Sequence, residues 1–561
     1  MKDGFWRLVT EEGAEWNFAY VLPQRGDEPI KIVVPTSLQM GWIESPAYFG
    51  AASETARDVA AQYAEQGVGE IPRHKFTKYT NQSEEYKSLP QEMQSHTDLK
   101  YMFEVFVDDF ISLCIPRCQA DLDHVANSLL HAIHDVFPAD DNDENDPTSL
   151  KKQLQGDGQW KLVKEILGWV FDGEQKTMQL EARKAEKLLK DLKAMGRSRR
   201  PIPFKEFEKT LGRARHAAEG IPAGKGMFTP INMMLGQRDK VAKVWIRPGS
   251  PLQQAIKDLR TLIKEAQKEP THCKELVTGH PGYVGIMDAA KEGAGGVVIG
   301  ENSGCVPTVF RLEWPEEVRK EVQSEHNRTG KLTNSDLELA GLLLLWLVME
   351  AVCPNLQHEH VALFSDNTPT VSWVDRLASK SSKVAGGLLR ALAFRLRARR
   401  ASPLVPLHIK GKQNSISDIP SRSFGGTPAW HCKTDEEFLT MFNSKFPLPK
   451  QNSWQLFRIS KDVSMKVISA LLMKDTGMGE WQRLPKLGTS IGGNGKLMSS
   501  LWEWTLTCRK PLQPTLQNAE CSQDSQHESE LESMAEDARL QLHQYLQRSQ
   551  PLARRSLWTQ G

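Results

Sequence analysis

The chain has 561 residues, which is too long for one hydrophobic core and predicts roughly three or four domains. Its 71 Lys and Arg residues nearly balance its 70 Asp and Glu residues, so the net charge is +1 and excludes a protein that binds nucleic acid through bulk basicity. The eight cysteines form no C-x-x-C and no Cys/His zinc spacing, which excludes a disulfide framework and a zinc finger and indicates the cytoplasm or nucleus.

Two features argue against a membrane or secreted protein. The longest apolar run, LAGLLLLWLVM at residues 339–349, is far short of a membrane span and is bounded by Glu338 and Glu350. The N-terminus MKDGFWRLVT has no apolar signal core. We therefore predict a buried helix at 339–349 and no membrane partner.

Residues 1–135 alternate short apolar strands with amphipathic helices, a pattern typical of an α+β domain. The strand-like pieces are FWRLV, WNFAYVL, IKIVV, YMFEVFV and FISLCI, and the helix-like pieces cover 45–66 and 121–137. Residues 138–149, PADDNDENDPTS, are acidic and lack large apolar side chains, which predicts a loop.

Two adjacent carboxylates interrupt the apolar run EVFVDDFISL at residues 104–113. Burying unpaired charge in such surroundings costs several kcal/mol. If Asp108 and Asp109 form the tip of a β-hairpin, both can reach one ligand, and a divalent cation would cancel their charge. The alternative from these residues alone is a polar turn between two strands.

The middle of the chain predicts paired strands followed by charged helices. The strands are WKLVKEILGWVFD and KTMQL, and the helices cover 181–195, 204–220 and 251–267. A Gly/Pro-rich break, IPAGKG, follows the second helix.

A second pattern, of the α/β type, starts near residue 281. Three successive strands (283–290, 293–300 and 306–314) precede the long helix at 335–352, and strands at 360–366 and 403–409 then alternate with helices at 368–378, 383–400 and 415–422. This order predicts a compact mixed sheet with three antiparallel strands and flanking helices. Beyond residue 425 we predict a small helical appendage near 447–474, and a disordered Gln/Ser/Glu-rich tail.

Four carboxylates of this second pattern sit at strand ends or helix starts: Asp288, Glu338, Asp366 and Asp418. Acids at one edge of a mixed sheet repel one another unless metal lies between them. Two Mg²⁺ ions in such a cluster can activate water and stabilise the leaving oxygen of a phosphodiester. The alternative is that Asp366 and Asp418 cap helices and that Asp288 caps a turn.

At this point the chain resembles a known family, the reverse transcriptase–RNase H segment of retrotransposon polyproteins, of the long-terminal-repeat or tyrosine-recombinase type. The segments SLQMGWIESPAYF and LGW resemble parts of the polymerase, and FVDD at 106–109 resembles its tyrosine-x-Asp-Asp box with Phe106 in place of tyrosine. MDAA, ELA, SDN and HIKGKQNSISDIPSR resemble the four acidic motifs of RNase H in order. The resemblance covers about residues 1–425.

The resemblance implies a domain order. It implies a partial reverse-transcriptase palm without fingers at 1–180, thumb or connection helices at 181–270 and an RNase H-like mixed sheet with flanking helices at 281–425, followed by the appendage of unknown role at 426–511 and the tail at 512–561.

For the polymerase part, the resemblance implies metal binding by Asp108 and Asp109, with template–primer nucleic acid and deoxynucleoside triphosphates as partners. Gly41 would allow close approach of the template or nucleotide. Ser45 would cap the helix behind it, with Pro46 in the first turn.

The polymerase pattern lacks its third aspartate. By the family's pattern this residue would stand immediately before Met1 or where Met1 stands, and Asp3 is out of register. We therefore predict that the chain as written does not polymerise DNA, because it begins at an internal methionine or is a decayed copy.

The RNase H part has all its acids, and the resemblance implies cleavage of RNA in an RNA–DNA hybrid with Mg²⁺ or Mn²⁺ held by Asp288, Glu338, Asp366 and Asp418. A basic helix could hold phosphates or serve as solubilising surface through Arg390, Arg395, Arg397, Arg399 and Arg400. His408 could assist product release or pack in a strand. The competing hypotheses are an inactive nucleic-acid-binding relic of a transposable element and an unrelated cellular nuclease.

Overall fold

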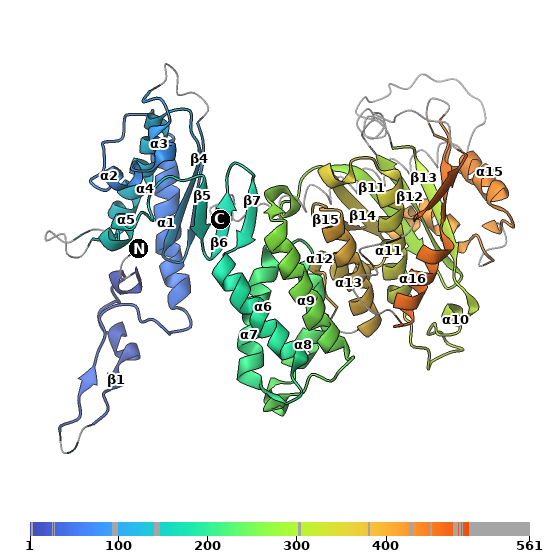
Figure 1. The fold of residues 1–561 in the computed structure, drawn as a ribbon, viewed down its shortest axis with the longest axis horizontal. Helices are drawn as coiled ribbons and strands as arrows, with labels where there is room; N and C mark the ends of the chain where they lie inside the picture. Colours follow the sequence, from blue (N-terminus) through green and yellow to red (C-terminus); the bar gives the residue numbers. More distant parts are fainter. Residues whose placement is uncertain are drawn as a thin grey trace, which may run out of the picture. The chain divides into compact units, whose positions relative to one another are not determined.

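A computed structural model describes residues 1, 4–24, 26, 28–92, 99–137, 139, 146–300, 305–379, 382–425, 430–448, 452–474, 481, 484 and 486–492. Asp3 lies outside the described residues, and so does the tail at 512–561, which we predicted to be disordered. The chain divides into two compact units (Figure 1). Unit 1 comprises residues 1–166 and 171–174, and unit 2 comprises residues 167–170 and those from 175 onward.

Unit 1 has the predicted α+β character. Its helices are η1 (Gly4–Arg7), η2 (Ala14–Phe18), α1 (Ser45–Ala64), α2 (Thr77–Thr80), α3 (Glu84–Lys87), α4 (Gln119–Val136) and α5 (Leu150–Leu154). Its strands are β1 (Tyr20–Val21), β2 (Ile32–Val33), β3 (Lys100–Phe106), β4 (Asp109–Ile115) and β5 (Val163–Ile166), while β6 (Trp169–Asp172) has residues in both units.

The core of unit 1 forms where α1 and α4 pack on the β3–β4 hairpin. Ala56, Ala60 and Ala64 recur every four residues of α1 and are buried, so a neighbouring helix can approach closely. Phe103 of β3 and Val125 of α4 pack against this row. The hairpin is thereby held on a rigid support.

A chain of hydrogen bonds runs through the histidines of unit 1. His74 Nδ1 accepts from the Phe76 amide (3.2 Å), so Nε2 carries the proton and lies 3.4 Å from Nδ1 of His134. His134 Nε2 lies 3.1 Å from Asp146 Oδ1, and Lys75 Nζ is 2.7 Å from the other oxygen of that carboxylate. Burial, reinforced by the neighbouring histidines, lowers the pKa of His74 to about 3. Burial also lowers the pKa of His134, so both rings are neutral in the fold.

We expect unit 1 to lose stability as the pH falls below about 6.5. The folded-state pKa of His74 lies below its ordinary value. Between pH 6.5 and about 3, His74 is therefore protonated in the unfolded chain but neutral in the folded unit, and this difference favours unfolding. This stability is complete above pH 6.5 and is lost on acidification. Urea unfolding of the full chain at pH 8 and pH 5 checks this, and His74→Gln should lose less stability between the two. An equal loss in both proteins would contradict it.

Unit 2 starts with a helical part that carries short antiparallel strands. Its helices are α6 (Ala182–Arg197), α7 (Phe204–Glu219), η3 (Gly224–Phe228), α8 (Thr229–Leu235), η4 (Arg238–Lys240), α9 (Pro251–Lys268) and η5 (Cys273–Glu275). Its strands are β7 (Thr177–Leu180), β8 (Ile202–Pro203), β9 (Lys243–Val244) and β10 (Thr271–His272), with β10 antiparallel to β7 and β9 antiparallel to β8.

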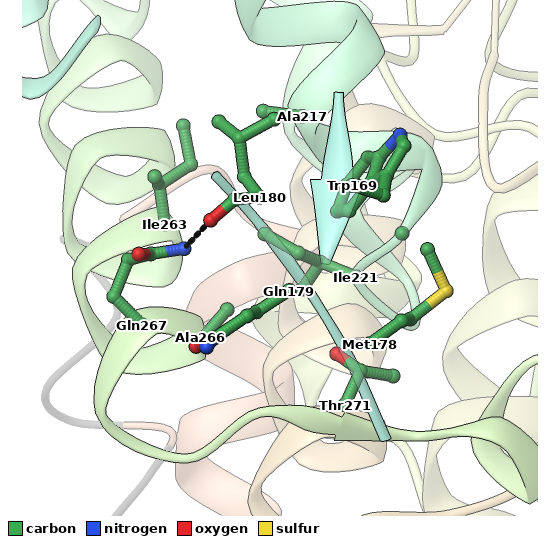
Figure 2. A pocket seen from close by; sticks show the side chains of 11 residues that line it. Trp169, Met178, Gln179, Leu180, Ala217, Ile221, Ile263, Ala266, Gln267 and Thr271 are labelled. Carbon is green, nitrogen blue, oxygen red and sulfur yellow. Dashed lines mark hydrogen bonds between the residues drawn. The ribbon is translucent and has the colours of Figure 1, made fainter. Parts of the chain in front are cut away.

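A narrow cavity lies in this helical part between β7, α7 and α9 (Figure 2). Its walls are mostly apolar, and Gln267 closes one side by donating from Nε2 to the Leu180 carbonyl (3.0 Å). Thr271 Oγ1 is buried in the wall without a hydrogen-bond partner among the described residues. Since no lining residue is titratable, the cavity offers no acid or base for chemistry.

A seven-stranded sheet forms the rest of unit 2, in the order β15-β14-β11-β12-β13-β16-β17. The strands are β11 (Pro281–Ala289), β12 (Gly293–Gly300), β13 (Thr308–Glu313), β14 (His360–Ser365), β15 (Leu404–His408), β16 (Gln455–Ile459) and β17 (Gly488–Ile491). β11, β12 and β13 are antiparallel neighbours, whereas β14 runs parallel to β11 and β15 runs parallel to β14. The predicted mixed sheet with three antiparallel strands and flanking helices is confirmed.

The sheet extends further than the sequence predicted. β16 pairs in parallel with β13, and β17 is antiparallel to β16, so residues expected in a helical appendage continue the sheet. QLFRI at 455–459 alternates too briefly to identify a strand by itself, and only the helix α16 (Lys461–Leu471) was predicted here.

Helices cover both faces of the sheet. They are α10 (Glu316–Arg319), α11 (Asn334–Val352), η6 (Leu356–His358), α12 (Thr368–Arg376), α13 (Lys383–Ala398), η7 (Gly411–Gln413), α14 (Ser415–Arg422), α15 (Asp435–Lys445) and α16. Alternate residues of β11 face opposite ways: Met287 packs toward Gly341 of α11, whereas Ile286 packs on the cluster that contains α14 and α15. Figure 1 shows α11, α13 and α16 lying together beside the sheet.

The long apolar helix is buried as predicted. α11 is inaccessible on all sides over most of its length, because strands cover one side and α13 and α16 the other. Among the described residues, no helix combines the length and apolar character that crossing a membrane requires.

Candidate active site

Three carboxylates converge at one edge of the seven-stranded sheet. Asp288 is the penultimate residue of β11, and Asp366 directly follows β14, the parallel neighbour of β11. Glu338 lies near the start of α11, the helix that covers the Met287 face of the sheet. Because parallel neighbours end at the same edge, the two aspartates meet there, and Glu338 reaches the same point. One oxygen of each carboxylate lies within 4.8 Å of the others.

The cluster is buried on one side and open on the other. Asp288 and Glu338 are only 4% and 2% exposed, whereas Asp366 is half-buried. Among the described residues, none of the three forms an ion pair, and Glu338 Oε2 is buried without a hydrogen-bond partner. An uncompensated buried carboxylate is costly unless a cation or a proton neutralises it.

The electrostatics of the cluster favour the protonated acids. Burial, with the charges of Asp366 and Asp418, raises the pKa of Asp288 to about 6 against the effect of a Ser421 hydrogen bond. Burial, then the charges of Asp288 and Asp366, raises the pKa of Glu338 well above its ordinary value. Burial also raises the pKa of Asp366. Neighbouring acids whose pKa values are shifted by burial and by one another's charge are typical of a functional site.

The capping alternative for these acids is not supported by the structure. The cap of α12 is Asn367, whose side-chain oxygen accepts from the Thr370 amide (3.0 Å), and not Asp366. Asp288 accepts from the Ser421 hydroxyl of α14 rather than from the turn that follows β11. Asp366 therefore does not cap α12 and Asp288 does not cap a turn, so both carboxylates can serve as metal ligands.

Asp418, the fourth predicted acid, lies near the cluster but outside the set of three. Its carboxylate pairs with Arg422 one turn later in α14, and its charge still raises the pKa of Asp288 and Asp366. An oxygen-only set of three carboxylates with an unpartnered buried oxygen fits a hard divalent cation. Asp288, Glu338 and Asp366 are the residues that would hold it.

Two residues that sequence reasoning missed orient these acids. Ser421 donates its hydroxyl to Asp288 Oδ2, and the buried Asn414 donates from Nδ2 to the Met287 carbonyl (3.3 Å). A hydrogen bond from the Asn414 side chain also counteracts the raised pKa of Asp366. Asn414 directly precedes α14 and Ser421 lies within it, and their polar side chains on either side of Asp418 in NSISDIPS were the available signal.

The second predicted acid pair lies at a hairpin tip, as expected. Phe106 pairs with Asp109, which leaves Val107 and Asp108 as the two-residue connection. Val107 has φ 57°, a left-handed value that a β-branched residue rarely adopts, and such outliers concentrate at functional sites. Asp109 Oδ1 lies 3.4 Å from Lys152 Nζ. Phe106, the last residue of β3, is exposed.

No third acid joins Asp108 and Asp109 within the described part of the chain. The Met1 α-amino group instead donates to the Asp108 carbonyl (2.7 Å). A pair of carboxylates with a lysine beside it is a weaker cation site than the cluster of unit 2.

The two other predicted residues of unit 1 behave differently from each other. Gly41 has φ 103°, a left-handed value that favours glycine, and an added Cβ would meet nothing within 4 Å; its role in the approach of a template or nucleotide stays a prediction. Ser45 was wrongly assigned as the helix cap: α1 begins at Ser45 with Glu44 before it, and the Ser45 hydroxyl donates to the Gln39 carbonyl (2.6 Å). The hydroxyl thus stabilises the loop that carries Gly41, not the helix end.

Comparison with known proteins gives only distant likenesses. Neither a protein-family model nor a curated protein matches the chain. Three solved structures of a foamy viral protease–reverse transcriptase each match 73% of this chain at 13% identity. The dRH form in complex with double-stranded DNA matches with a TM-score of 0.34, the complex with an RNA/DNA hybrid with 0.32, and a further complex with double-stranded DNA with 0.31. The chain spans 56%, 43% and 66% of those chains, respectively. Such low scores place the chain in no family, so its own residues must carry the function.

The predicted phosphate-binding helix is α13, and its arginines are already paired. Arg395 and Arg399 both pair with Glu350 of α11, and Arg397 and Arg400 both pair with Glu275 of η5. Arg390 lies 3.7 Å from Asp258 of α9. Arg395 and Arg397 are buried in these ion pairs and join helices to one another, whereas the side chains of Arg399 and Arg400 are 46% and 42% exposed. Phosphate binding or a solubilising role by the exposed arginines stays a prediction.

His408 ends β15 and is half-buried, with Nε2 3.1 Å from the Asp366 backbone carbonyl. This contact places the ring beside the acid cluster but not on a carboxylate. A role in product release stays a prediction.

Proposed function

We propose that unit 2 carries a nuclease site that depends on Mg²⁺ or Mn²⁺ and hydrolyses the RNA strand of an RNA–DNA hybrid. The observation that carries this proposal is the convergence of Asp288, Glu338 and Asp366, of which the first two are buried and none forms an ion pair among the described residues. Support for the substrate class comes from the order of the four acidic motifs along the chain, which resembles that of RNase H.

The protein's own groups supply position and charge. Asp288 and Asp366 present oxygens at a spacing fixed by the β11–β14 hydrogen bonds, and Glu338 is fixed by the buried helix α11. A bound divalent cation would lower the pKa of a water molecule and offset the charge of the phosphodiester. We assign Asp418 as a fourth acid that joins the site when it leaves Arg422.

The open side of the cluster indicates where a strand would enter. Asp366 and Asp418 are half-buried, and the exposed Lys410 and Lys412 flank Gly411, where an added Cβ would lie 3.1 Å from Asp366 Oδ2. Lysines beside the exposed acids would attract a phosphate backbone. The buried Glu338 side is closed to a substrate of this size.

Cleavage assays with labelled strands test the proposal on the full chain. We expect Mg²⁺-dependent cutting of RNA in an RNA–DNA hybrid, no cutting of the DNA strand and no activity in EDTA. Hybrid binding without cutting at any Mg²⁺ or Mn²⁺ concentration would favour the inactive relic. Cutting of single-stranded RNA or of duplex DNA at the same rate would favour the unrelated nuclease.

Unit 1 is expected to be inactive as a polymerase. Because Asp108 and Asp109 have no third carboxylate among the described residues, one cation would lose a bridging ligand. Primer extension with a template–primer and all four deoxynucleoside triphosphates should give no product with this chain. Extension that disappears in Asp109→Asn would contradict this expectation.

A further inference from the structure

The segment that follows the nuclease site in sequence packs beside it in space. α14 carries Asp418 and Ser421, and Ile416 and Ile419 on its inner face join a buried cluster. The same cluster contains Phe438 and Phe442 of α15. α14 and α15 therefore share one core on the Asp288 face of the sheet.

Glycine lets α14 lie directly on the strand that pairs with β11. Gly295 is the register partner of Asp288, and a Cβ at Gly295 would lie 2.6 Å from the Pro420 backbone. This close approach brings the Ser421 hydroxyl onto Asp288. A small movement of α14 would therefore separate Ser421 from Asp288 and displace Asp418.

Arg311 of β13 holds the end of α14. Its guanidinium donates from Nη1 to Ser423 Oγ (3.1 Å) and lies 5.0 Å above the Phe424 ring. The side chain is only 6% exposed, so these contacts are shielded from water. Ser423 and Phe424 directly follow the helix, which makes Arg311 its anchor.

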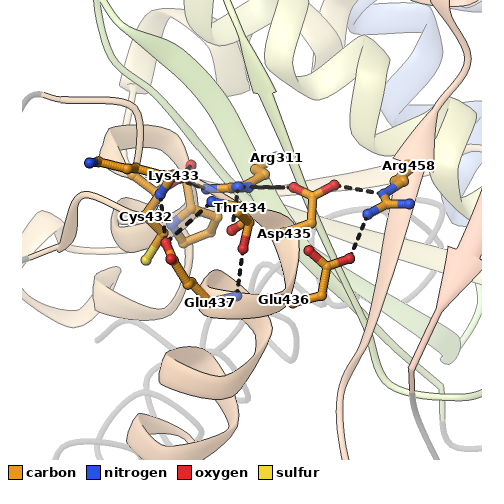
Figure 3. Close-up of polar contacts among 10 residues, drawn as sticks. Arg311, Cys432, Lys433, Thr434, Asp435, Glu436, Glu437 and Arg458 are labelled. Carbon is orange, nitrogen blue, oxygen red and sulfur yellow. Dashed lines mark hydrogen bonds and ion pairs between the residues drawn. The ribbon is translucent and has the colours of Figure 1, made fainter.

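The segment after α14 holds Arg311 in turn (Figure 3). Asp435 at the start of α15 accepts from Arg311 Nε (3.1 Å) and Nη2 (2.9 Å), and the Thr434 carbonyl accepts from Nη2 (3.1 Å). Arg458 of β16 binds the other oxygen of Asp435 and also Glu436, without touching α14. Figure 3 shows Asp435 between the two arginines.

We propose that Arg311 is a positioning residue of the nuclease site and that α15, for which the sequence analysis predicted no role, acts through it. By fixing the guanidinium, Asp435 fixes the end of α14, and α14 holds Ser421 and Asp418 at the acid cluster. This inference rests on the proposed nuclease function. Supporting groups of this kind typically change metal affinity or activity by about 10–100-fold.

A matched pair of variants tests it in the full chain. Arg311→Met and Arg458→Met each remove one guanidinium from Asp435, but of the two arginines Arg311 is the one that donates to Ser423, directly after α14. Two quantities are measured at a temperature where both variants are folded by circular dichroism: hydrogen exchange of the peptide 414–425, and the Mg²⁺ concentration that gives half-maximal hybrid cleavage. Ser423→Ala, which removes a single acceptor of Arg311, serves as the mild variant.

We expect Arg311→Met to raise amide exchange in α14 and to raise the half-maximal Mg²⁺ concentration by about ten-fold or more. Arg458→Met should leave both quantities within about two-fold of wild type, and Ser423→Ala should change both in the direction of Arg311→Met. Unchanged exchange and Mg²⁺ response in Arg311→Met, or equal changes in Arg458→Met, would overturn the inference and leave the nuclease proposal standing.

Failure of the nuclease proposal gives a different result. If wild type cuts no hybrid at any Mg²⁺ or Mn²⁺ concentration, the proposed function fails, and the positioning role fails with it. The exchange measurement would then still report whether Arg311 anchors α14.

Discussion

Asp288→Asn should reduce Mg²⁺-dependent hybrid cleavage by about 10³-fold or more, because a charged oxygen ligand at the centre of the acid cluster is lost. Asn keeps the size of the side chain and can still accept from Ser421, so the fold is retained. Cleavage rates under single-turnover conditions measure the effect. Asp462→Asn, an exposed carboxylate of α16, is the control and should cleave at the wild-type rate.

The same substitution should stabilise the metal-free protein near pH 8. The folded-state pKa of Asp288, about 6, lies above its ordinary value of 3.8, so its favourable contribution exists at low pH and is lost as the pH rises through 6. Removing the charge should therefore add about 2–3 kcal/mol to the free energy of unfolding in EDTA. Adding Mg²⁺ should stabilise wild type much more than the variant. A variant that retains wild-type cleavage would refute the assignment of Asp288.

Glu275→Gln should destabilise unit 2 by about 3–5 kcal/mol, the usual cost of breaking a buried ion pair from one side. Glu275 is 1% exposed and receives Arg397 Nη1 at 3.2 Å and Arg400 Nη2 at 2.8 Å. Its loss leaves the buried Arg397 without its carboxylate and weakens the junction of η5 with α13. Urea or thermal unfolding followed by circular dichroism measures the change.

An exposed pair provides the control for this prediction. Glu316 of α10 pairs with Lys320, which directly follows the helix, and both side chains are more than 70% exposed. Glu316→Gln should change stability by less than about 1 kcal/mol, since solvent screens such pairs. If the two variants were equally stable, the Glu275 junction would contribute no more than a surface pair.

The sheet and its acids could be predicted because they depend on local patterns. Strand periodicity places Asp288 and Asp366 at strand ends, and the rule that parallel neighbours share an edge brings them together. The long apolar run identified α11, which positions Glu338. The order of strands and helices along the chain was therefore enough to predict that Asp288, Glu338 and Asp366 lie close together.

The features that the sequence analysis missed depend on contacts with residues far away in the chain. Arg395 and Arg397 of α13 look like part of a basic surface in the sequence, but they are buried in ion pairs with Glu350 and Glu275. Ser421 gains its role only because α14 lies on Gly295, and no local pattern indicates that contact. Similarly, QLFRI at 455–459 becomes a strand because the edge of β13 offers it hydrogen bonds.

The parallel pairing of β13 with β16 has a consequence for how the protein is made. All of α11 to α15 is synthesised between the two strands, so the edge of β13 stays open until residues 455–459 leave the ribosome. Pairings between such distant segments form slowly, and open strand edges promote aggregation. Fragments that stop near residue 425 should therefore collect in inclusion bodies, whereas chains that continue through β17 should be recovered in the supernatant.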